Sequence, residues 1–245
     1  MKILITNDDG IMAEGIQTLA RELEKDNEVI IIAPESQRSA QSHAITLHVP
    51  LVLKEVKLKD VKSKSYSVSG TPADCVRVGL ETIVKDADII FSGINAGLNA
   101  GMDILYSGTV SAAIEASIYK KPSIAVSAEL KDGKCNYDIA AKYARKLLEK
   151  VKDNLKSNIV LNLNVPCTEK PLGLKVCKVG GVIYDYFVEE ENEFGERILK
   201  LNGRREAPTE EGTDRYYLSN GYATLTPICY ELTNEKLIKE VENWL

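Results

Sequence analysis

Two adjacent carboxylates, Asp8 and Asp9, follow an apolar run at residues 2–6. Neighbouring carboxylates repel each other unless a cation neutralises them, and hard oxygen ligands of this kind suit magnesium or manganese. A solvated loop that caps the following helix would use the same residue types. The acidic pair by itself therefore leaves a cation site and a helix cap both open.

Three further loops combine hydroxyl, amide and glycine groups. Residues 35–42 carry several hydroxyls and one arginine, Arg38, so a hydroxyl can complete a metal shell and the arginine can neutralise phosphate. In residues 92–99, Asn95 offers a neutral oxygen to a cation, and the glycines allow close approach of backbone to a ligand. Residues 106–109 open a helix whose free N–H groups suit an oxyanion. Each loop taken alone is equally compatible with a surface turn or an ordinary helix cap.

The sequence contains no nucleophile paired with a base. It has no G-x-S-x-G motif, no cysteine next to a histidine, and only two histidines, His43 and His48. Metal-assisted hydrolysis is the simpler chemistry, because a cation polarises the phosphoryl oxygens and lowers the pKa of a water that attacks in line. His43 is a candidate proton carrier, with a surface histidine as the alternative.

The elements that position these loops alternate along the first two thirds of the chain. The patterns predict strands at residues 2–6, 29–33, 89–91, 123–127 and 158–163, and helices at 13–23, 73–84, 110–118 and 137–151. This alternation predicts an α/β fold with a Rossmann-like, doubly wound, mostly parallel sheet and helices on both faces. In such a sheet ligands bind beyond the carboxyl ends of the strands, where the four loops would meet.

The pattern becomes β-rich after Pro166. Strands are expected at residues 176–179, 182–188 and 198–201, with an acidic turn at 189–193, then a strand at 222–226 and a helix at 234–245. We therefore expect one domain over residues 1–245, with a protruding β-hairpin extension at about 176–222 and a C-terminal helix.

Composition excludes some classes of partner. Of the 245 residues, 44% are hydrophobic and 27% are charged, as in ordinary globular proteins. The formal charge of -5 offers no attraction to polymeric nucleic acid or to an anionic membrane, and no segment reaches the length of a membrane span. Five widely spaced cysteines without a C-x-x-C pair, and no signal peptide before the first strand, lead us to expect reduced thiols and a cytoplasmic location.

Motifs along essentially the whole chain resemble those of the SurE survival-protein family of 5′/3′-nucleotidases. They are ILITNDDG at 3–10, AP at 33–34 leading to RS at 38–39, SGTPADCV at 69–76, SGIN at 92–95 with Gly97 and Asn99, YSGTV at 106–110, NLNVP at 162–166, GTD at 212–214 and TP at 226–227. The chain departs from the family at Ala40 and Ala116, where glycine is usual, which affects the expected shape of the pocket.

The resemblance implies one divalent cation, Mg²⁺ or Mn²⁺, and a nucleoside monophosphate substrate cleaved at the 5′ position, with the 3′ position also open. It assigns the metal to Asp8, Asp9, Ser39 and Asn95, with Asp8, Asp9 and Asn95 catalytic, and the phosphate to Asn7, Asn99, Ser107, Gly108 and Thr109. It also implies a homodimer or homotetramer formed by exchange of C-terminal elements, for which Trp244 in the last helix is a candidate anchor.

Three alternatives remain at this point. A phosphatase of broader phosphomonoester specificity would use the same site. A non-catalytic, receiver-like magnesium-binding domain also places paired acids after its first strand, but it would need a shorter chain and a lysine at a later strand end. A phosphatase that forms an aspartyl-phosphate on Asp8 usually shows D-x-D, whereas the two acids here are adjacent.

Overall fold

The apolar run at the start of the chain forms β1 (Lys2–Thr6), which lies between β2 (Glu28–Pro34) and β5 (Ile89–Ala96). The other strands are β3 (Leu53–Val56), β4 (Lys64–Val68), β6 (Ser123–Ala128), β7 (Val160–Val165), β8 (Leu174–Val176), β9 (Asp185–Glu191), β10 (Arg197–Arg204) and β11 (Ala223–Ile228). The helices are α1 (Glu14–Leu23), α2 (Pro72–Val78), α3 (Gly108–Ile118), α4 (Tyr137–Val151), α5 (Asp214–Ser219) and α6 (Glu235–Glu242), with a π-helical turn at Gly79–Ile83 and a 3₁₀ turn at Gly101–Leu105.

The computed structural model describes residues 1–182, 184–204 and 209–245, and in this part of the chain the main sheet has the order β3-β4-β2-β1-β5-β6-β7-β11-β8. Strand β1 pairs in parallel with β2 on one side and with β5 on the other. The chain moves outward from β1 to β2 and β4, returns to β5, and continues outward through β6 and β7. This reversal puts the topological switch point between the carboxyl ends of β1 and β5, where doubly wound proteins bind ligands.

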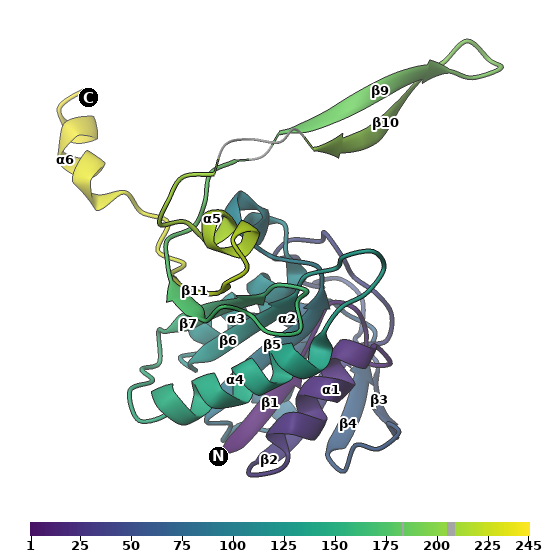
Figure 1. Ribbon diagram of the computed structural model, residues 1–245, viewed down its shortest axis with the longest axis vertical. Helices are drawn as coiled ribbons and strands as arrows, with labels where there is room; N and C mark the ends of the chain where they lie inside the picture. Colours follow the sequence, from purple (N-terminus) through teal and green to yellow (C-terminus); the bar gives the residue numbers. More distant parts are fainter. Residues whose placement is uncertain (183, 205–208) are drawn as a thin grey trace.

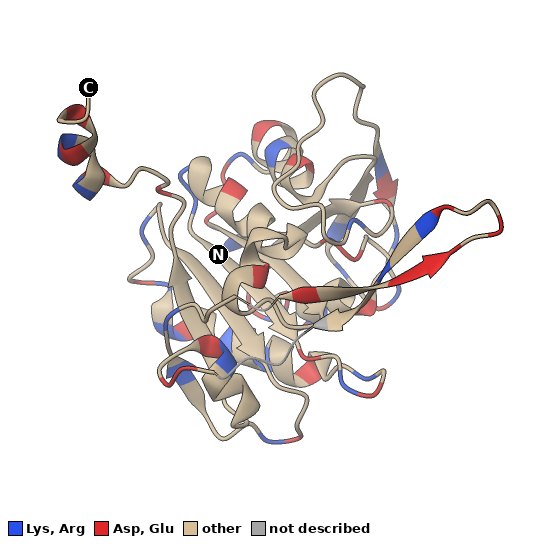
Figure 2. Ribbon diagram, turned by 90° about the horizontal axis from the view of Figure 1, so that it is seen from above, with Lys and Arg blue, Asp and Glu red and all other residues tan. Residues whose placement is uncertain are grey.

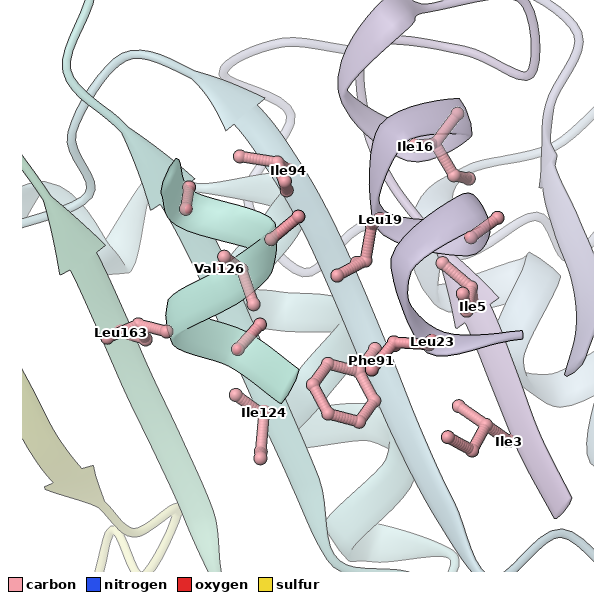
Figure 3. Close-up of a cluster of buried hydrophobic side chains, with 14 of the residues drawn as sticks. Ile3, Ile5, Ile16, Leu19, Leu23, Phe91, Ile94, Ile124, Val126 and Leu163 are labelled. Atoms are coloured by element: carbon pink, nitrogen blue, oxygen red, sulfur yellow. The ribbon is translucent and has the colours of Figure 1, made fainter. Parts of the chain in front are cut away.

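Alternate side chains of β1 are buried on opposite faces of the sheet. Ile3 and Ile5 belong to the core cluster under α1 and α4, whereas Leu4 belongs to the cluster under α2 and α3. Figure 3 shows the first cluster, with Leu19 and Leu23 of α1 lying over the sheet beside Phe91. Two helices therefore cover each face of the parallel sheet (Figure 1), which confirms the predicted fold class.

Strand β5 is longer than its apolar residues predict. The expected strand at residues 89–91 continues to Ala96, because the backbone pairs with β6 at Ser92↔Ala125 and again, after a bulge, at Asn95↔Ser127. The loop expected at residues 92–99 therefore begins inside the strand. Backbone hydrogen bonding outweighs the polar pattern here, and it gives Asn95 a defined position at the sheet edge.

Several elements differ from the sequence-based expectation. The edge strand β3, its neighbour β4 and the short helix α5 have no long apolar run, and the sequence patterns do not predict them. The helix expected at residues 73–84 is divided into α2 and the π-helical turn at Gly79–Ile83. Of the strand expected at 176–179, only Val176 lies in a strand, β8. Within the strand expected at 182–188, Ile183 lies outside the described residues.

The β9–β10 hairpin extends away from the body of the protein (Figure 1). The acidic turn expected at residues 189–193 begins later, at residue 192, because Glu189, Glu190 and Glu191 lie in β9. Acidic side chains of β9 and basic side chains of β10 lie along this ribbon (Figure 2). Glu189 accepts from the Nε of Arg197 at 2.5 Å, and Glu190 is paired with Lys200. Cross-strand charge pairs of this kind stabilise an antiparallel ribbon, so the glutamates extend the strand instead of ending it.

No helix in the described ranges is both long and apolar enough to span a bilayer.

The helix that the C-terminal pattern predicts is present as α6, and its ribbon projects from the body on a separate side from the hairpin (Figure 1). The single-domain division of the chain stays a prediction.

The contact between α1 and the end of β5 depends on Gly15. A Cβ atom at this position would lie 2.0 Å from the carbonyl oxygen of Ile94, the residue before Asn95. We expect Gly15→Ala to lower the free energy of unfolding by about 1–3 kcal/mol, since backbone must move to accept the methyl group. Urea unfolding measures this difference.

Gly181→Ala is the matched control, because no heavy atom of the described chain lies within 4 Å of a Cβ built there. Equal unfolding midpoints for Gly15→Ala and Gly181→Ala would contradict the close packing of α1 on β5.

Candidate active site

Asp8 is a buried carboxylate at the end of β1, with 4% of its surface exposed. Its Oδ1 accepts a hydrogen bond from the Oγ1 of Thr109, in the first turn of α3. Burial raises the pKa of Asp8 from its ordinary value of 3.8 to about 6; the Thr109 hydrogen bond opposes this change and the neighbouring Asp9 adds to it. The fold thus places the Asp8 carboxylate at a buried position, where water cannot solvate its charged form.

Asp9 connects the first loop to the end of β5. Its Oδ2 accepts the backbone N–H of Ala96 at 3.1 Å, and burial raises the pKa of this second carboxyl group as well. Asn95 is the preceding residue, and its Nδ2 donates to the carbonyl oxygen of Gly97 at 2.8 Å. Because the amide nitrogen is engaged, the Oδ1 of Asn95 is the atom left to face a cation.

The second loop reaches the same site through its backbone. The N–H of Arg38 donates to the carbonyl oxygen of Asp8 at 2.7 Å, which places Ser39 one residue away from this contact. Ser39 is exposed, and its hydroxyl accepts from the Nε2 of Gln37 at 3.0 Å. Ala40 has φ 55°, in the left-handed region, which explains why a glycine would suit this position.

The N-terminus of α3 packs directly against Asp8. A Cβ atom on Gly108 would lie 2.9 Å from the Cβ of Asp8, so this close approach requires glycine. Ser107 is the N-cap, and its hydroxyl accepts the N–H of Val110 at 3.1 Å. The start of α3 and the positive end of its helix dipole therefore lie beside Asp8.

Two of the predicted phosphate-binding residues are engaged in structural contacts. The Nδ2 of Asn7 donates to the carbonyl oxygen of Gly10 at 2.9 Å, and its buried Oδ1 has no hydrogen-bond partner. The Nδ2 of Asn99 donates to the Oγ of Ser127 at 2.9 Å in a buried position. Their assignment to phosphate stays a prediction, and that of Asn99 competes with a clear structural role.

A network of amides holds the Asn99 loop, and sequence reasoning gave its members no role. Asn162 and Asn164 of β7 both donate to the carbonyl oxygen of Asn99, at 2.8 and 3.0 Å, and the Oδ1 of Asn164 accepts the Asn99 N–H at 2.8 Å. The sequence signals were the NLNVP motif at 162–166 and the alternation of its two asparagines with apolar residues in a buried strand. Since buried amides need partners, this alternation indicates a polar contact on one face of β7.

Asp214 is a second buried carboxylate with a structural role. It accepts the backbone N–H groups of Gly101 and Gly180, each at 2.8 Å, and thereby connects α5 to the turn that follows the Asn99 loop. The GTD motif contains this residue, but its spacing does not reveal which backbone segments it contacts.

His43, the candidate proton carrier, pairs with Glu115 on α3. The His43 Nε2 lies 2.7 Å from the Glu115 Oε2, and the Nε of Arg77 lies 3.8 Å from the other oxygen of the same carboxylate. This contact gives His43 a structural partner on the side of the helix. Ala116, the second departure from the family pattern, is fully buried in the core under α2 and α3.

The residues at the switch point fit a divalent cation. Across residues 1–182, 184–204 and 209–245, no three or more histidine, cysteine, aspartate or glutamate side chains gather as a metal cluster. A cation here would therefore use the two carboxylates with the neutral oxygens of Ser39 and Asn95. This is an all-oxygen donor set, which suits Mg²⁺ or Mn²⁺ rather than a softer metal.

The fold and this edge together define a doubly wound α/β protein with an acidic pair facing a helix N-terminus across its switch point. The chain belongs to the SurE family: the model described as "Survival protein SurE" matches residues 3–185. The resemblance expected from the motifs is thus confirmed.

Relatives cover the chain almost completely. It is 56% identical over 248 aligned residues to "5'-nucleotidase SurE" of Clostridium botulinum (strain ATCC 19397 / Type A), covering 99% of this chain and 98% of that protein. It is 50% identical to the protein of the same name from Clostridium tetani (strain Massachusetts / E88), with both covered fully. The crystal structure of the SurE protein from Aquifex aeolicus superimposes with a TM-score of 0.88 at 33% identity, over 100% of this chain and 99% of that one.

Removing the charge of Asp8 should stabilise the metal-free protein. The folded pKa of Asp8 lies above its unfolded value, so the penalty is absent below about pH 4, grows as the pH rises, and is complete above about pH 6. In chelator at pH 8 we expect Asp8→Asn to unfold with a free energy higher by up to about 3 kcal/mol, and at pH 4 we expect no difference. Urea unfolding at both pH values measures this.

Asp60→Asn, at an exposed turn aspartate, is the control and should change neither value. An Asp8→Asn protein less stable than wild type at pH 8 in chelator would show that the buried charge is not the dominant cost.

Proposed function

We propose that this chain hydrolyses the phosphate of nucleoside 5′-monophosphates and that the reaction depends on one divalent cation. The observation that carries the proposal is the packing of Asp8 against the N-terminus of α3, with Asp9 as the next residue. It supports a cation site next to a phosphate site. The nucleotide part rests on family membership and on the name shared by the relatives from Clostridium botulinum and Clostridium tetani.

In this proposal Asp8, Asp9, Ser39 and Asn95 hold the cation. When bound, the cation supplies Lewis-acid polarisation of the phosphoryl oxygens and a lower pKa for an attacking water. Thr109 fixes the orientation of the Asp8 carboxylate by donating its hydroxyl proton to Oδ1.

The phosphate would lie at the entry of α3. The backbone N–H groups of Gly108 and Thr109 belong to the first turn, which has no intrahelical acceptors, and they suit anionic oxygens. The Ser107 hydroxyl accepts from Val110, so its own proton remains to be donated to the phosphate.

We also propose that the chain forms homodimers or homotetramers through its C-terminal part. The apolar side chains of α6 are exposed, with Leu237 at 42%, Ile238 at 46% and Val241 at 39%. The hairpin likewise exposes Phe187 and Leu199. Exposed apolar side chains on these two projecting elements support the proposal that a second copy of the chain packs against them.

The purified protein, incubated with a panel of 5′- and 3′-nucleoside monophosphates and p-nitrophenyl phosphate, tests the activity. We expect phosphate release from the 5′-nucleotides with Mg²⁺ or Mn²⁺ and none with chelator. Asp9→Asn and Asp8→Asn should each abolish release without unfolding the chain. Equal rates on every phosphomonoester would favour the broader phosphatase, and retained activity in both variants would sink the proposed site.

Ser107→Ala separates phosphate binding from metal binding. We expect a higher KM with an unchanged affinity for Mn²⁺, because the hydroxyl is assigned to the phosphate. Since the substitution also removes an N-cap worth about 1 kcal/mol, the matched control is Thr213→Ala, which removes the N-cap of α5, a helix that carries none of the proposed metal or phosphate ligands. A raised KM in both variants would assign the effect to helix stability alone.

A further inference from the structure

Arg38 is the one cationic side chain in the four loops at the switch point. Residues 6–10, 35–42, 92–99 and 106–109 contain no lysine and no other arginine. The two carboxylates already balance the charge of a divalent cation. A phosphomonoester dianion would then meet only the partial positive charge of one helix N-terminus, roughly half an elementary charge, unless a side chain supplies more.

The backbone of Arg38 is fixed at the site by its 2.7 Å hydrogen bond to the carbonyl oxygen of Asp8. Its guanidinium is poorly satisfied by the protein. The Nε is buried without a hydrogen-bond partner, and one terminal nitrogen makes a long 3.5 Å contact with the carbonyl oxygen of Ser69. A guanidinium has five N–H donors, and a buried donor without an acceptor is costly, so an acceptor from outside the chain would fit here.

The neighbouring carboxylates do not accept hydrogen bonds from the Arg38 guanidinium. Asp74 and Arg38 both shift the pKa of the Cys75 thiol. The Asp74 carboxylate accepts hydrogen bonds from the N–H and Oγ1 of Thr46 and from the N–H of Thr71, at 2.6 to 3.1 Å. Asp8 is engaged by Thr109, and Arg38 takes part in none of the ion pairs found in the described part of the chain. The Arg38 backbone is therefore bonded to Asp8, while its guanidinium lies near Ser69 and Cys75 with its donors largely uncommitted.

We infer that Arg38 is a catalytic residue that binds the phosphoryl oxygens of the substrate, opposite the cation. The inference rests on the proposed function, which it deepens by naming the side chain that neutralises the substrate. A planar guanidinium can donate two parallel hydrogen bonds to one phosphoryl group, which adds orientation to charge. Its contribution grows in the transition state, where charge spreads over the transferred oxygens.

The first test measures binding without turnover. Titration calorimetry with inorganic phosphate in the presence of Mn²⁺ compares wild type with Arg38→Gln and Arg38→Lys, and a separate titration gives the Mn²⁺ affinity. We expect phosphate affinity to fall at least about tenfold in Arg38→Gln and less in Arg38→Lys, with Mn²⁺ affinity within about twofold of wild type in both. A parallel loss of Mn²⁺ affinity would overturn the inference, since Arg38 would then only shape the metal loop.

The second test is chemical rescue. We expect Arg38→Ala to lose about 10²- to 10³-fold in kcat/KM and to regain at least about tenfold with low millimolar guanidinium, but nothing with the same concentration of urea. Urea matches guanidinium in shape and lacks its charge. Arg21→Ala is the matched control, because Arg21 contacts Thr18 on α1, away from the site, and its loss should leave kcat/KM unchanged.

The outcomes separate this inference from the proposed function. An active wild type whose Arg38 variants keep full phosphate affinity and activity would overturn the role of Arg38 and leave the nucleotidase proposal standing. An inactive wild type whose phosphate binding still falls in Arg38→Gln would overturn the nucleotidase and support Arg38 as an anion ligand. Should Arg38→Ala fail to fold, Arg38→Lys and Arg38→Gln decide the matter by phosphate affinity.

Discussion

The burial of the Asp8 carboxylate against the start of α3 is the constraint on which the site depends. A charged group this poorly solvated is costly, and the protein offsets part of that cost with the Thr109 hydroxyl and the positive end of a helix. The helix approaches closely only because Gly108 has no side chain. In the proposed function a bound cation offsets the remaining cost of burying the Asp8 charge, so cation binding stabilises the folded protein.

The surrounding scaffold keeps this arrangement rigid. The N–H of Ala96 holds Asp9, while the amides of Asn162 and Asn164 hold the loop beyond β5 from β7, two strands away in the sheet. Asp214 adds a second anchor through backbone N–H groups. Breaking a hydrogen bond in a buried network of this type is costly, so these contacts favour one conformation of the loops. Precise placement of ligands follows from contacts made mostly by residues with no chemical role.

Charge balance links the site to the rest of the molecule. Two carboxylates attract a cation, yet they would also repel a phosphate, so a positive group must lie on the substrate side. Arg38 has the position and the unsatisfied donors for this. The hairpin and α6, by contrast, lie outside the body and expose apolar side chains, which suits assembly instead of chemistry (Figure 1).

The sequence by itself determined the class of fold, since strand and helix periods alternate, and it located the acidic pair and the helix entry, since such residues follow strands. It missed β3 and β4, which have no apolar run, and it placed an acidic turn where cross-strand ion pairs extend β9. Only the tertiary structure decided that Asn99 is committed to a buried network, that His43 pairs with Glu115, and that the Nε of Arg38 has no hydrogen-bond partner among the described residues. The physical reason is that periodicity reports which face of an element is buried, whereas hydrogen-bond partners come from segments far apart in the chain and exist only after packing.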